Sequence, residues 1–376
     1  MRILLVTFSN LLPAALNNVL NPALEYCAIV VDEPEPAKKF FYEAGLDSNL
    51  IYPFYELKEC IADFYYDFLL CVSDGRQIWD LHKNFKMYGL PKNKFVYFFL
   101  NDNNFLVKRA LQYYEKHSAE FEIFATGSSY TAMGLDAHRF KYKLFNLGSS
   151  GQDLYYDYQI AKYILSKAEN KFRYALIGLA PHSFHCDISK TYAFNWRLSQ
   201  YFIALKDLHN FWLPAEDYQK IFRQEYLSSK IFIDNLDVNN IYLEKNALRF
   251  IDCNARIEAR KKIDLWKSRT FPETRTENIK TLENYLSLCE NCKVKAIIFL
   301  PPMTEGYMKY SSRQKLDEFY YIVQTAQKKF SSAVFFDGWK LKAFDDTNFW
   351  DVNQLNIKGA AKFSAILNNF IETLEK

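Results

Sequence analysis

The sequence predicts an α/β protein built from two parallel sheets in two domains. Short apolar segments alternate with helical patterns through the first hundred residues and again from about residue 120, which is typical of parallel sheets. The length of 376 residues exceeds what one ordinary hydrophobic core holds. No internal repeat or low-complexity segment interrupts the pattern, so we expect no disordered linker.

The composition excludes several classes of partner. Hydrophobic residues make up 49% of the chain and charged residues 24%, as in ordinary globular proteins. The formal net charge of +3 creates no field that would attract nucleic acid or an anionic membrane. The first residues lack the features of a signal peptide, and no segment is apolar for long enough to span a bilayer. We therefore expect a cytoplasmic protein without a membrane span.

The cysteines predict neither a disulfide framework nor a metal site. There are seven, an odd number, and they are widely scattered. Cys289 and Cys292 form the only close pair, with no second pair and no histidine nearby, so zinc is not expected. No organic cofactor is expected in the second domain either.

Four apolar segments predict the strands of the first domain, at residues 3–8, 26–31, 68–73 and 95–100. Helical patterns at 13–20, 55–62 and 77–85 lie between them, and Gly89-Leu90-Pro91 marks a turn before the fourth strand. This arrangement predicts a small Rossmann-like domain over residues 1–118.

Nucleotide binding by this domain stays open. The turn after the first strand, Ser9 to Pro13, has no glycine, although a dinucleotide site needs glycines there for close approach of the pyrophosphate. Asp32 and Glu33 end the second strand, where an acid that binds ribose would lie. They are candidate ligand-binding residues for a nucleotide or nucleotide-sugar, or ordinary loop acids.

A second domain is expected over residues 119–376, after a helix at 104–116. Its predicted strands lie at residues 121–125, 144–147, 174–179, 294–300 and 333–336. A mostly helical insertion occupies about 196–289, and a last helix begins near Asn356.

Polar residues follow the strands of this domain, where ligands bind in open parallel sheets. Gly127-Ser128-Ser129 follows the first strand, and would place the Ser129 hydroxyl at a helix N-terminus, either as a nucleophile or as part of a helix cap. The second strand ends in Gly148-Ser149-Ser150-Gly151, which is either a substrate-binding loop or a plain turn. His182 and His185 follow the third strand as a candidate base, metal ligand or loop residues.

The decisive block is Asp351-x-x-Gln354-Leu355-Asn356-x-x-Gly359-Ala360. Together with the earlier serine and glycine blocks, and in the same order, it resembles the SGNH (GDSL-type) hydrolases, whose last block reads Asp-x-x-His. The resemblance covers about residues 120–376 and is strongest to the branch that includes the D-alanine transfer protein of teichoic acids. It implies a flavodoxin-like α/β domain with esterase or acyltransferase activity.

The resemblance also implies roles for individual residues. Ser129 would be the nucleophile, its N–H and that of Gly148 would form the oxyanion hole, and Asp351 would orient the base. The asparagine that the family places after its third core strand has no counterpart here. Gln354 stands in place of the family's histidine, and a carboxamide has no basicity near pH 7.

Three hypotheses follow from this glutamine. The protein is an acyl-ester hydrolase or O-acyltransferase acting on a carbohydrate or glycan precursor, with His182, His185 or Asp351 as a displaced base. Alternatively, it is a catalytically degenerate relative that binds a glycan, or an interaction module in a glycan-modification pathway. A basic stretch in the insertion is either a solvated helix face or a phosphate-binding surface; it comprises Arg256, Arg260, Lys261, Lys262, Lys267, Arg269 and Arg275.

Overall fold

A computed structural model of the chain describes residues 1–18, 20–73, 95–99, 106–167, 171–190, 195–211 and 271–375. These residues belong to two compact units, and each is described by itself. Residues up to 99 lie in the first unit and residues from 106 in the second. Helix α5, Leu106–His117, belongs to the second unit, so the division falls before this helix and not at residue 118.

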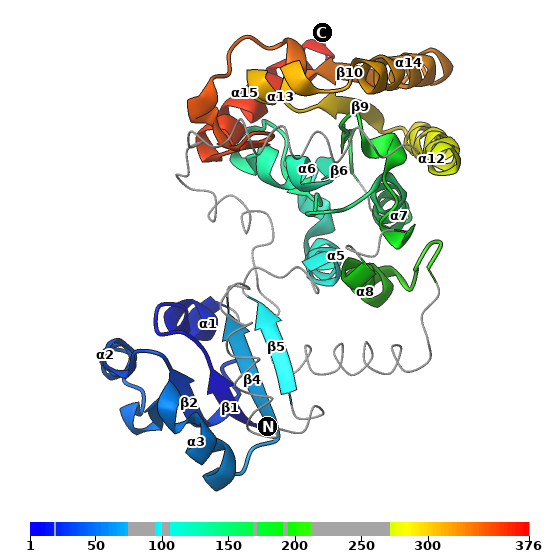
Figure 1. The fold of residues 1–376 in the computed structure, drawn as a ribbon. Coiled ribbons are helices and arrows are strands. Elements are labelled where there is room, and N and C mark those ends of the chain that lie inside the picture. The colour runs from blue at the N-terminus through cyan, green and yellow to red at the C-terminus, as the bar shows by residue number, and fades with distance from the viewer. Residues whose placement is uncertain are drawn as a thin grey trace. The chain divides into compact units, whose positions relative to one another are not determined.

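The first unit contains a five-stranded parallel sheet with the order β3-β2-β1-β4-β5 (Figure 1). Its strands are β1 Arg2–Val6, β2 Glu25–Val31, β3 Ile51–Pro53, β4 Phe68–Ser73 and β5 Phe95–Phe99. Its described helices are α1 Leu12–Asn18, α2 Pro34–Glu43 and α3 Leu57–Asp63.

Both faces of this sheet are buried, because alternate residues of each strand point to opposite sides. Ile3 and Leu5 pack with Phe41 of α2 on one face. Leu4 and Val6 pack with Leu57 of α3 on the other face. This explains why the strands are apolar at consecutive positions.

Two elements of the first unit differ from the sequence prediction. Helix α2 was not predicted, because its two prolines, Pro34 and Pro36, indicate a loop, although proline is well tolerated in the first turn of a helix. Strand β3 was not predicted either, because its three residues are too few to show a period. The expected helix at 77–85 and the turn at 89–91 lie outside the described residues.

The second unit contains another five-stranded parallel sheet, with the order β10-β9-β8-β6-β7 (Figure 1). Its strands are β6 Ile123–Gly127, β7 Leu144–Asn146, β8 Tyr174–Gly178, β9 Lys295–Leu300 and β10 Val334–Asp337. Besides α5, its described helices are α6 Ser129–Gly134, α7 Leu154–Leu165, α8 Asn195–Leu205, α12 Pro272–Asn291, α13 Glu305–Tyr310, α14 Arg313–Lys329 and α15 Ile357–Thr373.

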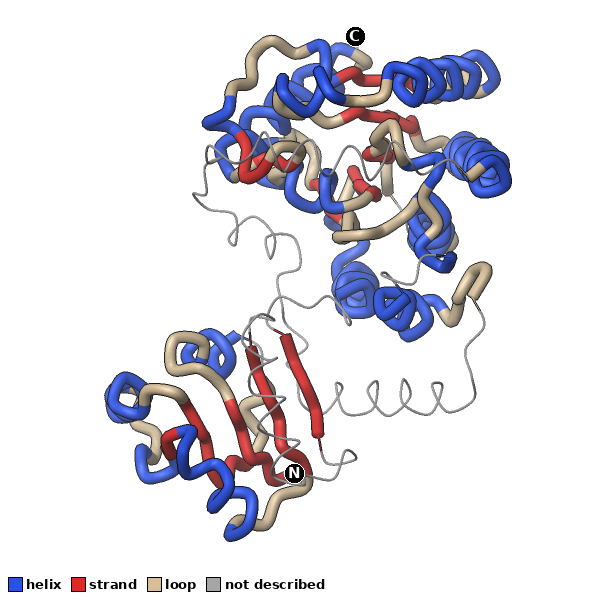
Figure 2. Tube along the Cα trace, viewed as in Figure 1, coloured by secondary structure: helices blue, strands red, loops and turns tan. Residues whose placement is uncertain are grey.

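Helices cover both faces of the second sheet. Ile123 and Leu176 pack with Phe363 and Leu367 of α15 on one face. On the other face Thr126 of β6 hydrogen-bonds to Tyr285 of α12 across 2.9 Å, and α12 packs along α7. Figure 2 shows the strands enclosed by helices within this unit. The predicted α/β class with parallel sheets is therefore confirmed.

Strand β6 runs two residues further than predicted. Gly127 pairs with Gly178 of β8, so the strand continues through a Thr-Gly sequence that the pattern had assigned to a turn. The insertion expected at 196–289 is described only at its two ends, by α8 and α12.

A short hairpin precedes the last helix. Strands β11 Phe349–Asp351 and β12 Gln354–Leu355 pair antiparallel. Asn356 caps α15 by accepting a hydrogen bond from the N–H of Gly359 at 3.0 Å, and its Nδ2 donates to the carbonyl oxygen of Thr347. The hairpin is thus anchored at the start of α15. In the described ranges, none of the helices combines the length and apolarity that crossing a bilayer demands.

Candidate functional site

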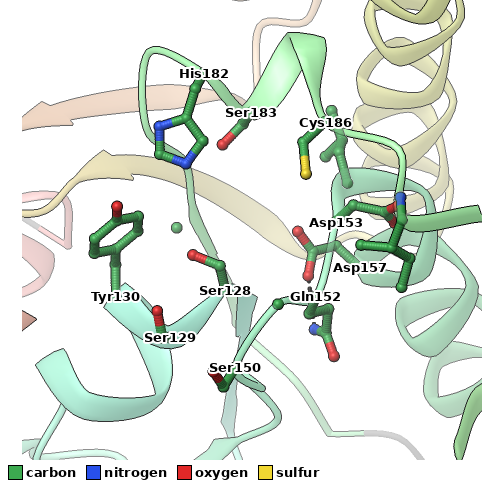
Figure 3. Close-up of a pocket in the computed structure, with 14 residues that line it drawn as sticks. Ser128, Ser129, Tyr130, Ser150, Gln152, Asp153, Asp157, His182, Ser183 and Cys186 are labelled. Atoms are coloured by element: carbon green, nitrogen blue, oxygen red, sulfur yellow. Dashed lines mark hydrogen bonds between the residues drawn. The ribbon is translucent and has the colours of Figure 1, made fainter. Parts of the chain in front are cut away.

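A cavity of about 170 Å³ lies at the carboxyl ends of β6 and β8 (Figure 3). The chain after β6, β7 and β8 supplies its walls. The lining residues are Ser128, Ser129, Tyr130, Ser150, Gly151, Gln152, Asp153, Leu154, Asp157, Gly178, His182, Ser183, Cys186 and Ile188. Ligands of open α/β sheets bind at such an edge, between the strands where the order of the sheet reverses.

Three glycines allow α6 to approach the sheet at this edge. A Cβ on Gly127, Gly148 or Gly178 would lie 2.1, 2.9 or 1.9 Å from an atom of the Thr131 side chain. Gly127 also has a φ of +143°, which side chains rarely allow. The glycines therefore bring the first turn of α6, with Ser128 and Ser129, directly onto the ends of β6 and β8.

The structure brings Ser129 and Gln354 together. Nε2 of Gln354 donates a hydrogen bond to Oγ of Ser129 across 2.9 Å. Gln354 begins β12, so the hairpin delivers it to the first residue of α6. The serine oxygen accepts this bond, which leaves its own proton available to a second group.

The neighbouring residue holds the hairpin in place. Nδ2 of Asn353 donates to the hydroxyl of Tyr130 at 2.8 Å, and Tyr307 hydrogen-bonds to the same pair. Asn353 and Tyr130 are both buried. Successive residues of the hairpin thus contact successive residues of α6, which determines where the Gln354 carboxamide lies.

Asp351 has a local structural role. Its Oδ1 accepts the backbone N–H of Asn353 at 2.9 Å, and its backbone is paired with that of Gln354 in the hairpin. The carboxylate thus stabilises the turn that carries Asn353 and Gln354. It can orient Gln354 through this turn.

Gly148 does not offer its amide to the cavity. Its N–H donates to Oδ1 of Asn146 at 3.0 Å, while Nδ2 of Asn146 donates to the carbonyl oxygen of Thr131. The same loop lines the cavity further on, at Ser150 and at Gly151, which has a φ of +80°. The N–H of Ser129, at the first position of α6, has no partner inside its own helix.

His182 lies in the same cavity as Ser129 (Figure 3). Its ring packs edge to face against Tyr130, with the ring centres 5.8 Å apart. Burial lowers the pKa of His182 to about 3, and the ammonium group of Lys315 adds to the shift. His182 is therefore neutral at pH 7, with a ring nitrogen able to accept a proton, although as a weak base.

Two buried carboxyl groups form the opposite wall. Burial raises the pKa of Asp153 to about 6, although its oxygens accept the N–H groups of Tyr156 and Ile188. Burial also raises the pKa of Asp157 well above 3.8, although Gln152 donates to it at 2.7 Å. Asp157 favours its protonated form, in which a carboxyl group both donates and accepts hydrogen bonds.

The remaining predicted residues that the structure describes are not among those that line this cavity. Asp32 and Glu33 belong to the first unit, where Oδ1 of Asp32 accepts the N–H of Ser9 at 2.7 Å and so holds the turn after β1. His185 is buried between Glu318, at 2.8 Å, and the backbone of Phe271. Of the basic stretch only Arg275 is described, paired with Glu318, and the other six residues lie outside the described ranges.

Most of the residues that line the cavity were not identified from the sequence. Asp153 carries a recognisable signal, because an aspartate after a glycine-rich loop is a common helix cap, and it caps α7. Asp157 lies one turn further along the same helix. Nothing local distinguishes Cys186 or Ile188 from other loop residues.

Neither the models of known protein families nor the characterised proteins compared with the chain gave a match.

Proposed function

We propose that the second unit is an SGNH-type domain that carries out acyl-ester chemistry at Ser129, by hydrolysis or O-acyl transfer on a carbohydrate or glycan precursor. The single observation that carries the proposal is the hydrogen bond between Ser129 and Gln354. It joins the serine block and the Asp-x-x-Gln block across 225 positions, as the resemblance requires.

The sheet order supports this fold. Numbered along the second unit, the order β7-β6-β8-β9-β10 is 2-1-3-4-5, that of flavodoxin-like sheets. The cavity lies between the ends of its first and third strands, which is where ligands bind in such sheets. The first sheet has the order 3-2-1-4-5, consistent with a Rossmann-like half.

The lining supports a ligand rich in hydroxyl groups. Ser128, Ser150 and Ser183 contribute hydroxyls, and Gln152 and Asp157 contribute a carboxamide and a carboxyl group. Such groups exchange hydrogen bonds with sugar hydroxyls. These polar groups face a cavity that aromatic rings do not fill. This disfavours the hypothesis that the domain serves only as an interaction module.

In the proposed reaction, Oγ of Ser129 attacks the carbonyl carbon of the ester, and the bond from that carbon to the sugar oxygen breaks. The serine proton passes to a ring nitrogen of His182 and then to the departing sugar oxygen. The N–H of Ser129 stabilises the oxyanion. Water, or the hydroxyl of a second sugar, then attacks the carbonyl carbon of the acyl-serine and gives its proton to His182. The bond from that carbon to Oγ of Ser129 breaks, Oγ takes the proton from His182, and the acid or the new ester is released.

Gln354 and His182 make this a slow enzyme. Gln354 holds Ser129 Oγ by donating to it and cannot remove its proton. His182, with a pKa of about 3, is a weaker base than an ordinary histidine. We expect turnover well below that of enzymes with a normal base, which contributes about 10²–10⁴-fold.

Glycan binding without catalysis is the second candidate. It is favoured by two observations: the base position holds a carboxamide, and the N–H of Gly148 is already bonded to Asn146. A nucleotide-sugar remains a candidate ligand through Asp32 and Glu33 of the first unit.

The test uses a fluorophosphonate serine probe and p-nitrophenyl acetate with the full chain. We expect wild type to be labelled and to turn over, and Ser129→Ala to lose both. Ser166→Ala is the matched control, since Ser166 is an exposed serine at the end of α7 and is not among the residues that line the cavity. His182→Ala should slow turnover without preventing folding.

If wild type is neither labelled nor faster than Ser129→Ala, the enzymatic proposal fails for simple esters. Equal binding of an oligosaccharide panel by wild type and Ser129→Ala would then support the second candidate.

A further inference from the structure

A second polar cluster lies behind one wall of the cavity. Asp187, His209 and Glu277 each present one ligand atom, and these atoms lie within 4.8 Å of one another. Asp187 lies between Cys186 and Ile188, which line the cavity. His209 follows α8, and Glu277 lies in α12. Nothing in the proposed acyl chemistry uses these side chains.

Hydrogen bonding determines which nitrogen of His209 carries a proton. Nε2 of His209 lies 2.6 Å from Oε1 of Glu277. Burial opposes ionisation of Glu277, but its hydrogen bonds and the nearby positive charges favour the carboxylate more strongly, so its pKa is lowered. A contact this short to a carboxylate places the proton on Nε2. In neutral His209 the lone pair is therefore on Nδ1.

Nδ1 points at a second carboxylate. It lies 3.5 Å from Oδ1 of Asp187 and makes no hydrogen bond within the described part of the chain. The side chains of His209 and Asp187 are only 7% and 3% exposed. A bare lone pair facing a buried carboxylate is unfavourable, so Nδ1 needs either a proton or a metal ion. Burial opposes a charge on His209, but Asp187 and Glu277 raise its pKa, so the site favours positive charge at this nitrogen and a metal ion would displace the proton.

The charges of the cluster leave room for a cation. Asp187 and Glu277 contribute two negative charges, and Lys190 contributes one positive charge at 3.2 Å from Asp187 and 3.4 Å from Glu277. With neutral His209 the sum is one net negative charge.

Nδ2 of Asn210 also lies 3.2 Å from Asp187, but Lys190 is 43% exposed and Asn210 is exposed, so both can move aside. Oδ1 of Asp187 also accepts the N–H of Ser189 at 2.9 Å and the Ser189 hydroxyl, and a metal ion at this oxygen would replace the hydroxyl.

The spacing of the two facing atoms fits a metal ion. Nitrogen and oxygen ligands at about 2.1 Å from zinc, at the tetrahedral angle, lie about 3.4 Å apart. Nδ1 of His209 and Oδ1 of Asp187 are 3.5 Å apart. Glu277, holding the opposite N–H of His209, completes the carboxylate–histidine–metal arrangement that orients ligands in many metal sites.

We propose that Nδ1 of His209 and the carboxylate of Asp187 bind a divalent transition-metal ion, zinc in the first place, with Glu277 orienting His209. The remaining positions of the ion are filled by water. The donor set of one imidazole and one carboxylate suits zinc better than magnesium or calcium, which prefer oxygen alone.

The ion has a structural role in this proposal. It joins the loop after α8 to the segment that supplies His182, Ser183, Cys186 and Ile188 to the cavity wall. Asp153, in that wall, already accepts the N–H of Ile188 from this segment at 2.8 Å. Metal binding would therefore stabilise one side of the cavity.

The experiment is equilibrium dialysis of chelator-treated full-length protein against Zn²⁺, with bound metal counted and the melting temperature followed. We expect one zinc per chain and a rise of several degrees in the melting temperature. His209→Gln and Asp187→Asn should each abolish both effects. Glu277→Gln should weaken binding about 10–100-fold, because it acts through His209.

His117→Gln is the matched control. His117 also pairs with a glutamate, Glu120 at 2.8 Å, which in turn pairs with Lys143, but no second carboxylate completes a cluster there among the described residues. Zinc binding should be unchanged in this variant. Circular dichroism of each zinc-free variant shows whether it is folded.

The seven cysteines require a second measurement, because thiolates also bind zinc. Co²⁺ in a nitrogen and oxygen site gives visible bands without the intense near-ultraviolet band of thiolate ligands. Three outcomes would each overturn the proposal: no bound metal, unchanged zinc binding in folded His209→Gln, or a Co²⁺ spectrum with the thiolate band. The cluster would then be an ion-pair network in which Lys190 and protonated His209 neutralise Asp187 and Glu277.

Discussion

Gln354 donates a hydrogen bond from Nε2 to Oγ of Ser129 across 2.9 Å, in the position where a base would accept the serine proton. Under the proposed function, this contact replaces a serine–base pair, with the direction of the hydrogen bond reversed. Oγ of Ser129 therefore accepts a hydrogen bond from the carboxamide, and the carboxamide cannot take up the proton of the serine hydroxyl.

Gln354→His should convert this contact into a serine–histidine pair. We expect hydrolysis of p-nitrophenyl acetate to rise by at least about 10²-fold, since the introduced imidazole accepts the proton that the carboxamide cannot. Gln354→Asn, which shortens the side chain and keeps its chemistry, should show no gain. If Ser129→Ala/Gln354→His gains as much as the single variant, the gain does not come from Ser129.

Gly178→Ala should destabilise the second unit. The added Cβ would lie 1.9 Å from Oγ1 of Thr131 and 2.7 Å from the Phe299 ring, so α6 must move away from the sheet. We expect a loss of about 1–3 kcal/mol or more in the free energy of unfolding, measured with denaturant. Gly306→Ala, with nothing within 4 Å, should be neutral or slightly stabilising. Equal effects of the two substitutions would refute this packing argument.

Asp153 should make stability depend on pH. Its pKa is about 6 in the folded protein, above the ordinary value of 3.8 expected in the unfolded chain. Its contribution is therefore complete below about pH 4 and is lost as the pH rises through about 6, by roughly 3 kcal/mol. The difference in unfolding free energy between wild type and Asp153→Asn should change across this window.

Asn at position 153 keeps the ability to cap α7 but loses the negative charge. The NH2 group of Asn cannot accept a hydrogen bond, so one of the N–H groups of Tyr156 and Ile188 loses its acceptor and the variant is expected to be less stable throughout. Only the change with pH tests the titration; parallel curves from pH 4 to 7 would contradict it.

Tyr130→Phe should loosen the hairpin that carries Gln354. Removing the hydroxyl leaves the buried Nδ2 of Asn353 without its 2.8 Å partner, at a cost of about 1–3 kcal/mol in unfolding free energy. Probe labelling of Ser129 should change as well. Tyr142→Phe is the control, because its exposed bond to Glu375 should contribute less than about 1 kcal/mol. Similar losses in both variants would argue against a special role for the buried pair.

The local sequence was sufficient for the longer strands of the two sheets, but not for the three-residue strand β3. Residues 123–125 and 296–300 are apolar at consecutive positions because both faces of their sheet are covered, and this shows in sequence without knowledge of the partners. The resemblance, and no local pattern, aligned the Ser129 block with the Gln354 block, and these two side chains are hydrogen-bonded in the structure.

Packing between distant segments decided the rest. Whether the Gly148 amide faces a ligand depends on the Asn146 side chain, and the pKa values of Asp153 and Asp157 depend on burial that no local pattern encodes. The cluster of Asp187, His209 and Glu277 likewise comes from three separate segments, so cysteine spacing along the chain could not reveal it. Periodicity and motif order are properties of neighbouring residues, so they can be read along the chain. Burial, hydrogen-bond direction and the spacing of ligand atoms exist only after remote segments have packed.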